Sequence, residues 1–207
     1  MTPLSTVILT ATQLEQAPLR QRLGDRYASH ALQWCIGGMG AGATAAATQR
    51  ILHEQAPRLI IQAGIAGSLR PDLTPATVHT AYIVRSDRQA DLGAWRSESG
   101  TFEPFATLPE AQTIECPYAE RLSPLLPQLP ARSTNSACMP LPLRDNEALE
   151  SMEGAAFFGV CRSGTIPYLQ LRSISNHVGD PRAAWRIDEA LKILTAGLEI
   201  VLRNFVP

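Results

Sequence analysis

The sequence contains a single lysine, Lys192, among its 207 residues. This excludes a phosphate-binding loop of the G-x-x-x-x-G-K type, because that motif needs a lysine after its glycines. The numbers of basic and acidic residues are also nearly equal, at 18 and 19. A chain with so little net charge lacks the basic surface that attracts nucleic acids or anionic membranes. We therefore expect a small neutral or weakly polar ligand, and neither nucleic acid nor membrane as a partner.

Signals for metal binding and for export are missing as well. The chain has four cysteines and four histidines, with no C-x-x-C pair and no spacing typical of a zinc site. We expect reduced thiols, no metal and no cofactor. The first basic residue is Arg20, the apolar run before it is short, and no later run approaches the length of a membrane span. These features predict a cytoplasmic protein.

The patterns that are present indicate an α/β protein with one core, and 45% of the residues are hydrophobic. In the first third, strands are predicted over residues 6–10, 32–38 and 58–69, and helices from residue 12 and over 41–55. The first helix begins with a capping box, in which Thr12 is the N-cap and Glu15 reaches back to it. The alternation predicts a single α/β domain over residues 1–207, with a central mixed β-sheet flanked by helices on both sides.

The second half of the chain is less regular. Between Pro104 and Pro142 it has eight of its 16 prolines, so we expect loops there, with one short helix and a strand near residues 131–138. Regular elements are then predicted as a helix over 150–164, a strand over 166–175 and an amphipathic helix over 183–205.

The segment "GGMGAGA" fits the pattern G-x-G-x-x-A at Gly38, Gly40 and Ala43, between a strand and a helix. A dinucleotide-binding turn has this pattern, but it usually follows the first strand and has an acidic residue at the end of the next one. Here the next strand ends in Ala63-Gly64. The favoured alternative is a tight turn that lets the helix pack closely.

In four places, polar or small residues lie at the start or the end of a predicted element. Glu15 and Asn176 follow strands. The run from Ala63 to Leu69 ends a third strand, and Glu153 begins a helix. Ligands of open α/β sheets bind at the carboxyl ends of the strands. Each residue alone also has an ordinary interpretation: Glu15 as a capping residue, Glu153 as a complement to the helix dipole, and Asn176 as a turn former.

Together and in this order, these segments resemble the nucleoside phosphorylase/nucleosidase superfamily. The similarity covers most of the chain, through "GMGAGATAAAT", "AGIAGSL" and "MEGAAF" to "RSISN". The resemblance implies that Glu153 binds the ribose hydroxyls and that Asn176 contacts the purine. It also places four further residues in the substrate-binding site: Ala66, Gly67, Met152 and Ser175.

Adenine-specific nucleosidases of the superfamily have aspartate where this chain has Asn176. An aspartic acid can donate to N7 and accept from the amino group of adenine, whereas an amide has two N–H donors that suit N7 and O6 of a 6-oxopurine. We therefore expect hypoxanthine or guanine as the base. With "RQADLGAW" and "SISNHVGDPRAAW", the chain resembles one branch in particular, the futalosine hydrolases. This resemblance implies release of hypoxanthine from futalosine during menaquinone synthesis.

Cleavage of an N-glycosidic bond passes through a transition state with oxocarbenium character. We assign activation of water to Glu15, binding of the ribose to Glu153 and stabilisation of the leaving purine to Asn176. Phosphorolysis needs a phosphate site, normally built with arginines, and the turn "TATQLEQ" after the first strand has none. Hydrolysis is therefore expected, although Arg70 and Arg172 have no assigned role.

Several alternatives stay open. They are a methylthioadenosine/S-adenosylhomocysteine nucleosidase, a purine nucleoside phosphorylase, and a non-catalytic protein that binds nucleosides. The resemblance also implies a homodimer or a larger homo-oligomer. Further candidates for the lining beyond the ribose are Ser68, Asp91 and the residues of "STNSAC".

Overall fold

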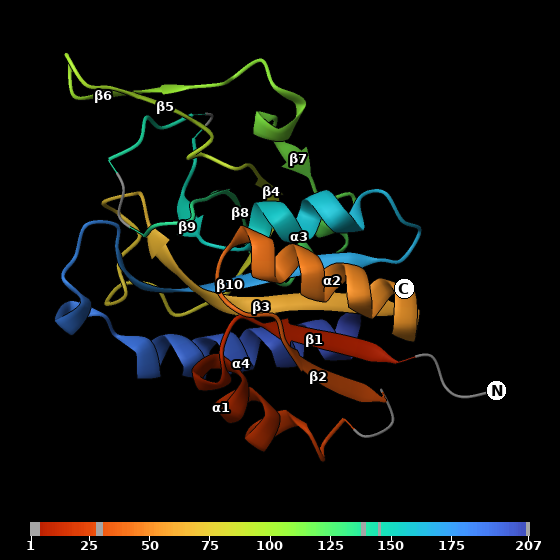
Figure 1. Ribbon diagram of the computed structural model, residues 1–207. Coiled ribbons are helices and arrows are strands. Elements are labelled where there is room, and N and C mark those ends of the chain that lie inside the picture. The colour runs from red at the N-terminus through yellow and green to blue at the C-terminus, as the bar shows by residue number, and fades with distance from the viewer. Residues whose placement is uncertain (1–4, 28–30, 138–139, 145, 206–207) are drawn as a thin grey trace.

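The computed structural model describes residues 5–27, 31–137, 140–144 and 146–205, which form a mixed sheet with helices on both sides (Figure 1). The strands of this sheet are β1 (Thr6–Thr10), β2 (Leu32–Ile36), β3 (Leu59–Ser68), β4 (Tyr82–Asp87), β7 (Ile114–Glu115), β8 (Gln128–Ser133), β9 (Leu149–Ser151) and β10 (Tyr168–His177). The α-helices are α1 (Gln13–Leu23), α2 (Ala41–Gln55), α3 (Gly154–Cys161) and α4 (Ile187–Asn204). The predicted fold class is confirmed.

Strand β3 is the centre of the sheet. It pairs in parallel with β1 and β10, and β1 pairs in parallel with β2. Strand β10 also pairs antiparallel with β4, which continues through β8 and β9 back to β3. Five strands therefore close into a ring, while β1 and β2 extend from it. Strands β1, β3 and β10 run parallel and end on the same side of the molecule, which the arrowhead of β3 marks in Figure 1.

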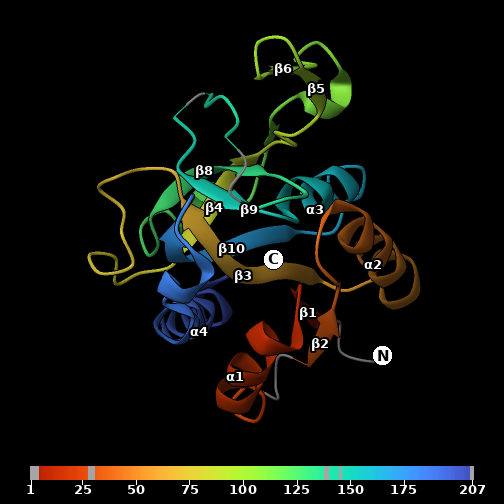
Figure 2. The same cartoon turned by 60° about the vertical axis from the view of Figure 1, so that its left-hand side comes forward.

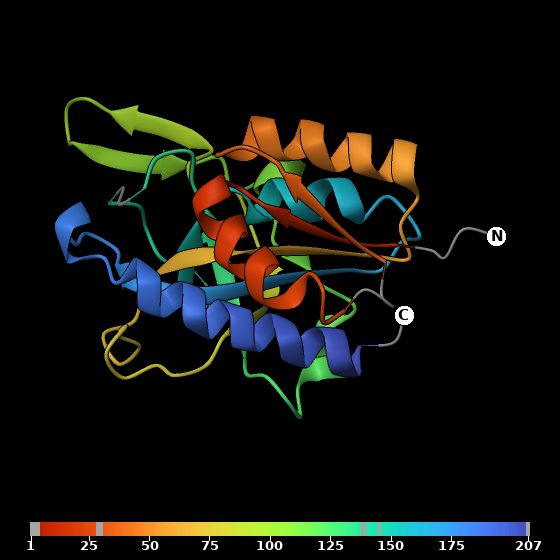
Figure 3. The same ribbon diagram turned by 90° about the horizontal axis from the view of Figure 1, so that it is seen from below.

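Two pairs of helices cover the sheet. Helices α2 and α3 contact each other on one side, and α1 and α4 contact each other on the other, as Figure 3 shows. The strands between them are buried, since all five residues of β1 and nearly all of β10 are shielded from solvent. This core fixes the strand ends from which the candidate site is built. None of the described helices is long and apolar enough to cross a membrane.

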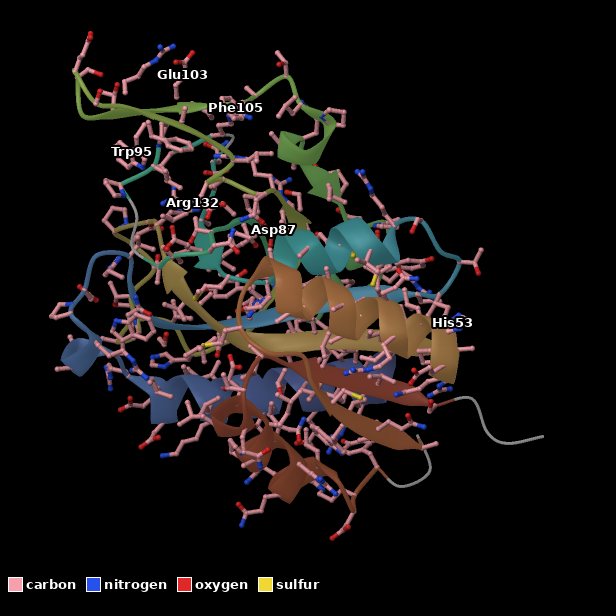
Figure 4. The ribbon with its side chains drawn as sticks, viewed as in Figure 1. His53, Asp87, Trp95, Glu103, Phe105 and Arg132 are labelled. Atoms are coloured by element: carbon pink, nitrogen blue, oxygen red, sulfur yellow. The ribbon has the colours of Figure 1, made fainter. Side chains whose placement is uncertain are left out.

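A two-stranded hairpin of β5 (Gly93–Arg96) and β6 (Thr101–Pro104) stands apart from the main sheet in Figures 1 and 2. Its base is held by a small apolar cluster of Ala90, Phe102 and Leu141. Trp95 of this hairpin and Phe105, which follows it, are about half exposed (Figure 4).

Some predicted limits were wrong. The helix expected from residue 150 begins only at Gly154, because residues 149–151 pair with β3 and β8 as strand β9. The strand expected near 131–138 ends at Ser133, and Cys138 lies outside the described residues. Instead of one short helix, the described residues of this middle part form two 3-10 helices, η2 (Pro109–Ala111) and η3 (Ala119–Leu122). The last helix begins at Ile187, after a third such turn, η4 (Arg182–Ala184).

Candidate active site

A cavity of about 270 Å³ lies where the carboxyl ends of β1, β3 and β10 meet the starts of α1 and α3. All seven residues that the sequence proposed for the site line it: Glu15, Ala66, Gly67, Met152, Glu153, Ser175 and Asn176. The fold thus brings together side chains from both ends of the chain. Their chemical roles stay predictions.

Glu15 is buried in the first turn of α1 and uses its two carboxylate oxygens differently. Oε2 accepts hydrogen bonds from the backbone N–H and the hydroxyl of Thr12, both at 3.1 Å, so the predicted capping box is present. Oε1 accepts from the backbone N–H of Ile65 at 3.0 Å, at the end of β3. The capping role and a role in the cavity are therefore compatible, because each uses a different oxygen.

Burial raises the pKa of Glu15 above its usual value, since a carboxylate is poorly solvated in the protein interior. The positive charge of Arg172 and the N–H of Ile65 counteract this rise, and the negative charge of Glu153 adds to it. A raised pKa makes the ionised carboxylate a stronger base. This is the direction that abstraction of a proton from water requires.

Glu153 occupies the N-cap position of α3, yet its side chain makes no cap hydrogen bond. Instead, Oε1 accepts a hydrogen bond from the backbone N–H of Gly40 at 3.2 Å, and Oε2 lies 3.5 Å from Nη1 of Arg172. The side chain is therefore turned away from its own helix and toward the cavity. Dipole complementarity alone does not account for this orientation.

The glycine-rich segment after β2 has a structural role at this site. Gly38 and Gly40 have φ values of +84° and +83°, which only glycine adopts readily. A Cβ at Gly38 would lie 2.9 Å from that of Ala43, so the turn also packs closely on α2. The favoured interpretation as a tight turn is confirmed, and the turn presents the Gly40 N–H to Glu153.

Arg172, which had no role in the sequence analysis, is buried behind two residues that line the cavity, Glu153 and Ile65. Its guanidinium donates to Oε1 of Gln170 at 2.9 Å, to Oε1 of Gln62 at 3.0 Å and to the carbonyl of Ile65 at 3.3 Å, besides pairing with Glu153. The signal that could have identified it is the sequence Gln-Leu-Arg inside a strand otherwise suited to the core. A buried charge needs partners of this kind.

Asn176 lies within β10, one residue before its end, after an irregularity in the pairing with β3. Its Oδ1 accepts from the Ser175 hydroxyl at 2.8 Å, and its Nδ2 donates to the carbonyl of His177 at 2.7 Å. One amide hydrogen is therefore already used. The expectation that both N–H donors face the purine was wrong, and one donor is left for the base.

A second buried network, unforeseen from the sequence, lies behind the site. Asp87, labelled in Figure 4, accepts from the Ser133 hydroxyl at 3.0 Å and from Nε2 of Gln170 at 3.1 Å. Gln170 in turn accepts from Arg172. Complete burial raises the pKa of Asp87 to about 7, although its hydrogen bonds and the charge of Arg172 oppose the rise.

The other candidate linings have mixed outcomes. Ala137 of "STNSAC" lines the cavity, whereas Ser68 borders a neighbouring hollow and its hydroxyl bonds to the backbone of Arg70. Asp91 accepts a hydrogen bond from the backbone N–H of Asn135 and does not line the cavity.

Comparison of the sequence with known families gives one clear match, because the sequence model of the phosphorylase superfamily matches residues 12–207. Futalosine hydrolase of Streptomyces coelicolor is 33% identical over 153 residues, which cover 66% of this chain and 62% of that enzyme. A 5'-methylthioadenosine/S-adenosylhomocysteine nucleosidase of Shewanella piezotolerans is 28% identical over 179 residues, or 80% of this chain and 75% of that enzyme.

Solved structures support the same fold. Futalosine hydrolase of Helicobacter pylori superimposes with a TM-score of 0.75 over 98% of this chain and 99% of its own, at 16% sequence identity. The methylthioadenosine/S-adenosylhomocysteine nucleosidase of the same organism, bound to butyl-thio-DADMe-Immucillin-A, gives a TM-score of 0.75 at 17% identity, over 99% of this chain and all of that one.

Proposed function

Because this chain belongs to the phosphorylase superfamily, we propose that it is a nucleosidase, an enzyme that hydrolyses the bond between a purine base and ribose. The observation that carries the proposal is the convergence of two buried glutamates and an amide side chain on one cavity. The curated relatives named above are nucleosidases, which supports the same class of reaction. The match covers less than two thirds of the Streptomyces enzyme, so activity and substrate are proposals.

In the proposed reaction, Glu15 is the general base that takes a proton from water as the water attacks C1′. The Ile65 N–H and Arg172 hold this carboxylate in place from one side. Glu153 accepts hydrogen bonds from the ribose hydroxyls. Its negative charge stabilises the positive charge that develops on the sugar in the transition state. Arg172 reduces the repulsion between the two carboxylates, which otherwise would raise the cost of holding both ionised.

The purine leaves with the electron pair of the C1′–N bond and takes up a proton from the solvent, while Asn176 donates a hydrogen bond from its remaining amide N–H to the charge that develops on the base. The Oδ1 of Asn176 accepts from the Ser175 hydroxyl at 2.8 Å, so an amino group of adenine would share that oxygen with Ser175. The remaining N–H can be donated to the O6 oxygen of a 6-oxopurine, an acceptor that the amino group of adenine does not provide. We therefore propose hypoxanthine as the base and futalosine as the substrate, and this supports a place in menaquinone synthesis.

Water, and not phosphate, is the proposed nucleophile. The floor of the cavity has the carboxylates of Glu15 and Glu153. The nearby guanidinium of Arg172 does not line the cavity and is already engaged by four partners. Arg70 pairs with Asp72 on the surface and does not line the cavity. A phosphate dianion bound beside Glu15 and Glu153 would therefore meet their negative charge, and Arg182, the arginine among the described residues that line the cavity, belongs to the exposed segment between β10 and α4.

A methylthioadenosine/S-adenosylhomocysteine nucleosidase is the second candidate, favoured by the Shewanella relative, whose match covers more of this chain. The deciding experiment incubates the purified protein with futalosine, inosine and methylthioadenosine, each with and without phosphate, and measures the free base by chromatography. We expect hypoxanthine from futalosine at a rate that does not depend on phosphate. Release of adenine alone would favour the second candidate, phosphate dependence would indicate a phosphorylase, and binding without release would contradict catalysis.

The homodimer or larger homo-oligomer implied by the resemblance is also proposed for this chain. Light scattering coupled to gel filtration measures it directly, since a monomer has a mass of 22.4 kDa.

A further inference from the structure

The mouth of the cavity has a feature that the reaction does not explain. The segment between β10 and α4 contributes Arg182 and Trp185 to the cavity lining. In Figure 1 this segment extends beyond the carboxyl end of β3. The guanidinium of Arg182 lies over the ring of Trp185, 4.6 Å from its centroid, and the ring N–H donates to the carbonyl of Asp180 at 3.2 Å. The arginine is thus held in place by stacking.

Arg182 has no counter-ion within the described residues, unlike Glu150 and Glu153 of the same cavity. Glu150 pairs with Arg132 and Glu153 pairs with Arg172. Within the described part of the chain, no carboxylate lies within ion-pair distance of Arg182. The neighbouring Arg186, by comparison, is neutralised by Glu189 at 3.0 Å and does not line the cavity.

Part of the cavity lining is apolar and open to solvent. Leu14 is 55% exposed and Met39 is 66% exposed, and both line the cavity together with Trp185. Large apolar side chains at the mouth of a site are surface that an apolar part of a ligand can cover. The combination of apolar walls and one arginine with no carboxylate partner suits a ligand group that is apolar in its body and anionic at its end.

We propose that Arg182 and Trp185 form a subsite for an aromatic carboxylate on the part of the nucleoside beyond the ribose. This rests on the proposed function, and it would distinguish the two candidate substrates. The buried carboxylates of Glu15 and Glu153 repel an anion from the floor, so the acid lies at the mouth, where the planar guanidinium can bind both carboxylate oxygens. An uncharged methylthio group would make no use of Arg182.

The test compares futalosine, which carries an aromatic carboxylate beyond its ribose, with inosine, which has the same base and ribose without the acid. The kcat and KM of base release are measured for the wild type, Arg182→Gln and the matched control Arg186→Gln. We expect Arg182→Gln to lower the ratio of kcat/KM for futalosine to that for inosine at least tenfold, or about 1.4 kcal/mol, mainly through KM. Arg186→Gln should leave the ratio within twofold of the wild type.

A second measurement does not depend on turnover. Calorimetric titration of futalosine into Glu15→Gln and into Glu15→Gln/Arg182→Gln should show at least tenfold weaker binding to the double variant. If the wild type releases no base from any nucleoside, the proposed function fails and this titration still decides on the subsite. Equal binding by the two variants, or an unchanged substrate ratio in a protein that does release base, would overturn the subsite while leaving the nucleosidase proposal in place.

Discussion

Glu15 combines a structural and a proposed catalytic role within one carboxylate. Replacing it with Gln retains the shape and one of the two acceptor oxygens, so the helix can still be capped. The base is lost, and we expect kcat for base release to fall by about 10²- to 10⁴-fold. Steady-state kinetics measures the loss, and circular dichroism checks that the fold is retained.

The matched comparison for Glu15 is Thr12→Ala, which removes the hydroxyl of the capping box without touching the contact to Ile65. A lost N-cap costs about 0.5–2 kcal/mol of stability, and turnover should change little. If Thr12→Ala and Glu15→Gln lowered kcat by similar factors, Glu15 would be acting through the start of α1 and not as a base.

Asn176 is the residue that the base-preference hypothesis depends on. Asn176→Ala should lower kcat at least a hundredfold, since loss of a preorganised donor to a developing anion costs about 2.7–4 kcal/mol. Asn176→Asp should shift preference from 6-oxopurine toward 6-aminopurine nucleosides. It should also lower the melting temperature, because an ionised oxygen would face the carbonyl of His177, which now accepts from the amide at 2.7 Å. Rates on inosine and adenosine that keep the same ratio in both proteins would contradict this role.

Among the elements, the end of β3 leaves the least room for a larger side chain beside the site. A Cβ at Gly64 would lie 2.8 Å from Oε1 of Glu15 and would clash with the guanidinium of Arg172. Gly64→Ala should therefore displace both groups and lower kcat at least tenfold. Gly42, in the first turn of α2, has no atom within 4 Å of an added Cβ. Gly42→Ala should leave turnover unchanged and stabilise the protein by about 0.5–1 kcal/mol.

Both glycine variants are assayed by kinetics and urea denaturation. A Gly64→Ala enzyme with normal turnover would show that the strand end can shift without disturbing the two buried charges. It would also weaken the argument that close approach of β3 fixes the site.

The sequence predicted helices correctly where neighbouring residues alone determine their limits. Helix α2 was predicted with its observed limits because a glycine turn precedes a run of alanines, and the capping box located the start of α1. The last two residues of β9 were predicted as helix because this short segment is a strand only through its pairing with β3 and β8. Without those distant partners, the segment before Glu153 is indistinguishable from the first turn of a helix.

The same limit applies to the site. Strand ends and motif order identified the cavity residues, but the contacts of Arg172 with Gln62 and Glu153 join segments that are adjacent only in the folded sheet. The hydrogen bond from Asn176 to His177 depends on the backbone angle at the end of β10. No spacing in the sequence shows that one of its two donors is already used.

At the scale of the whole molecule, two groups of carboxyls give stability opposite dependences on pH. Asp72, Glu189 and Glu199 have pKa values below their usual range, through hydrogen bonds or ion pairs with arginines, so their contribution is present at neutral pH and lost on acidification. Glu15 and Asp87 have raised pKa values because of burial. Their folded forms retain a proton that the unfolded chain releases, so they favour the folded state at low pH and lose that contribution as pH rises.

Asp87 allows this dependence to be measured. Its pKa moves from 3.8 in the unfolded chain to about 7 in the folded protein, so its contribution is lost progressively between these two pH values. The free energy of unfolding of the wild type should therefore fall relative to that of Asp87→Asn as pH rises from 5 to 8, as measured by urea denaturation. An asparagine can still accept from Gln170 and donate to Ser133, so the variant should fold.

Asp72→Asn is the matched control. Because the pKa of Asp72 is lowered, the difference in unfolding free energy between the wild type and this variant should stay constant from pH 5 to 8. If the difference in unfolding free energy between the wild type and Asp87→Asn also stayed constant with pH, Asp87 would be ionised throughout this range. Arg172 and the hydrogen bonds of Asp87 would then outweigh the effect of burial.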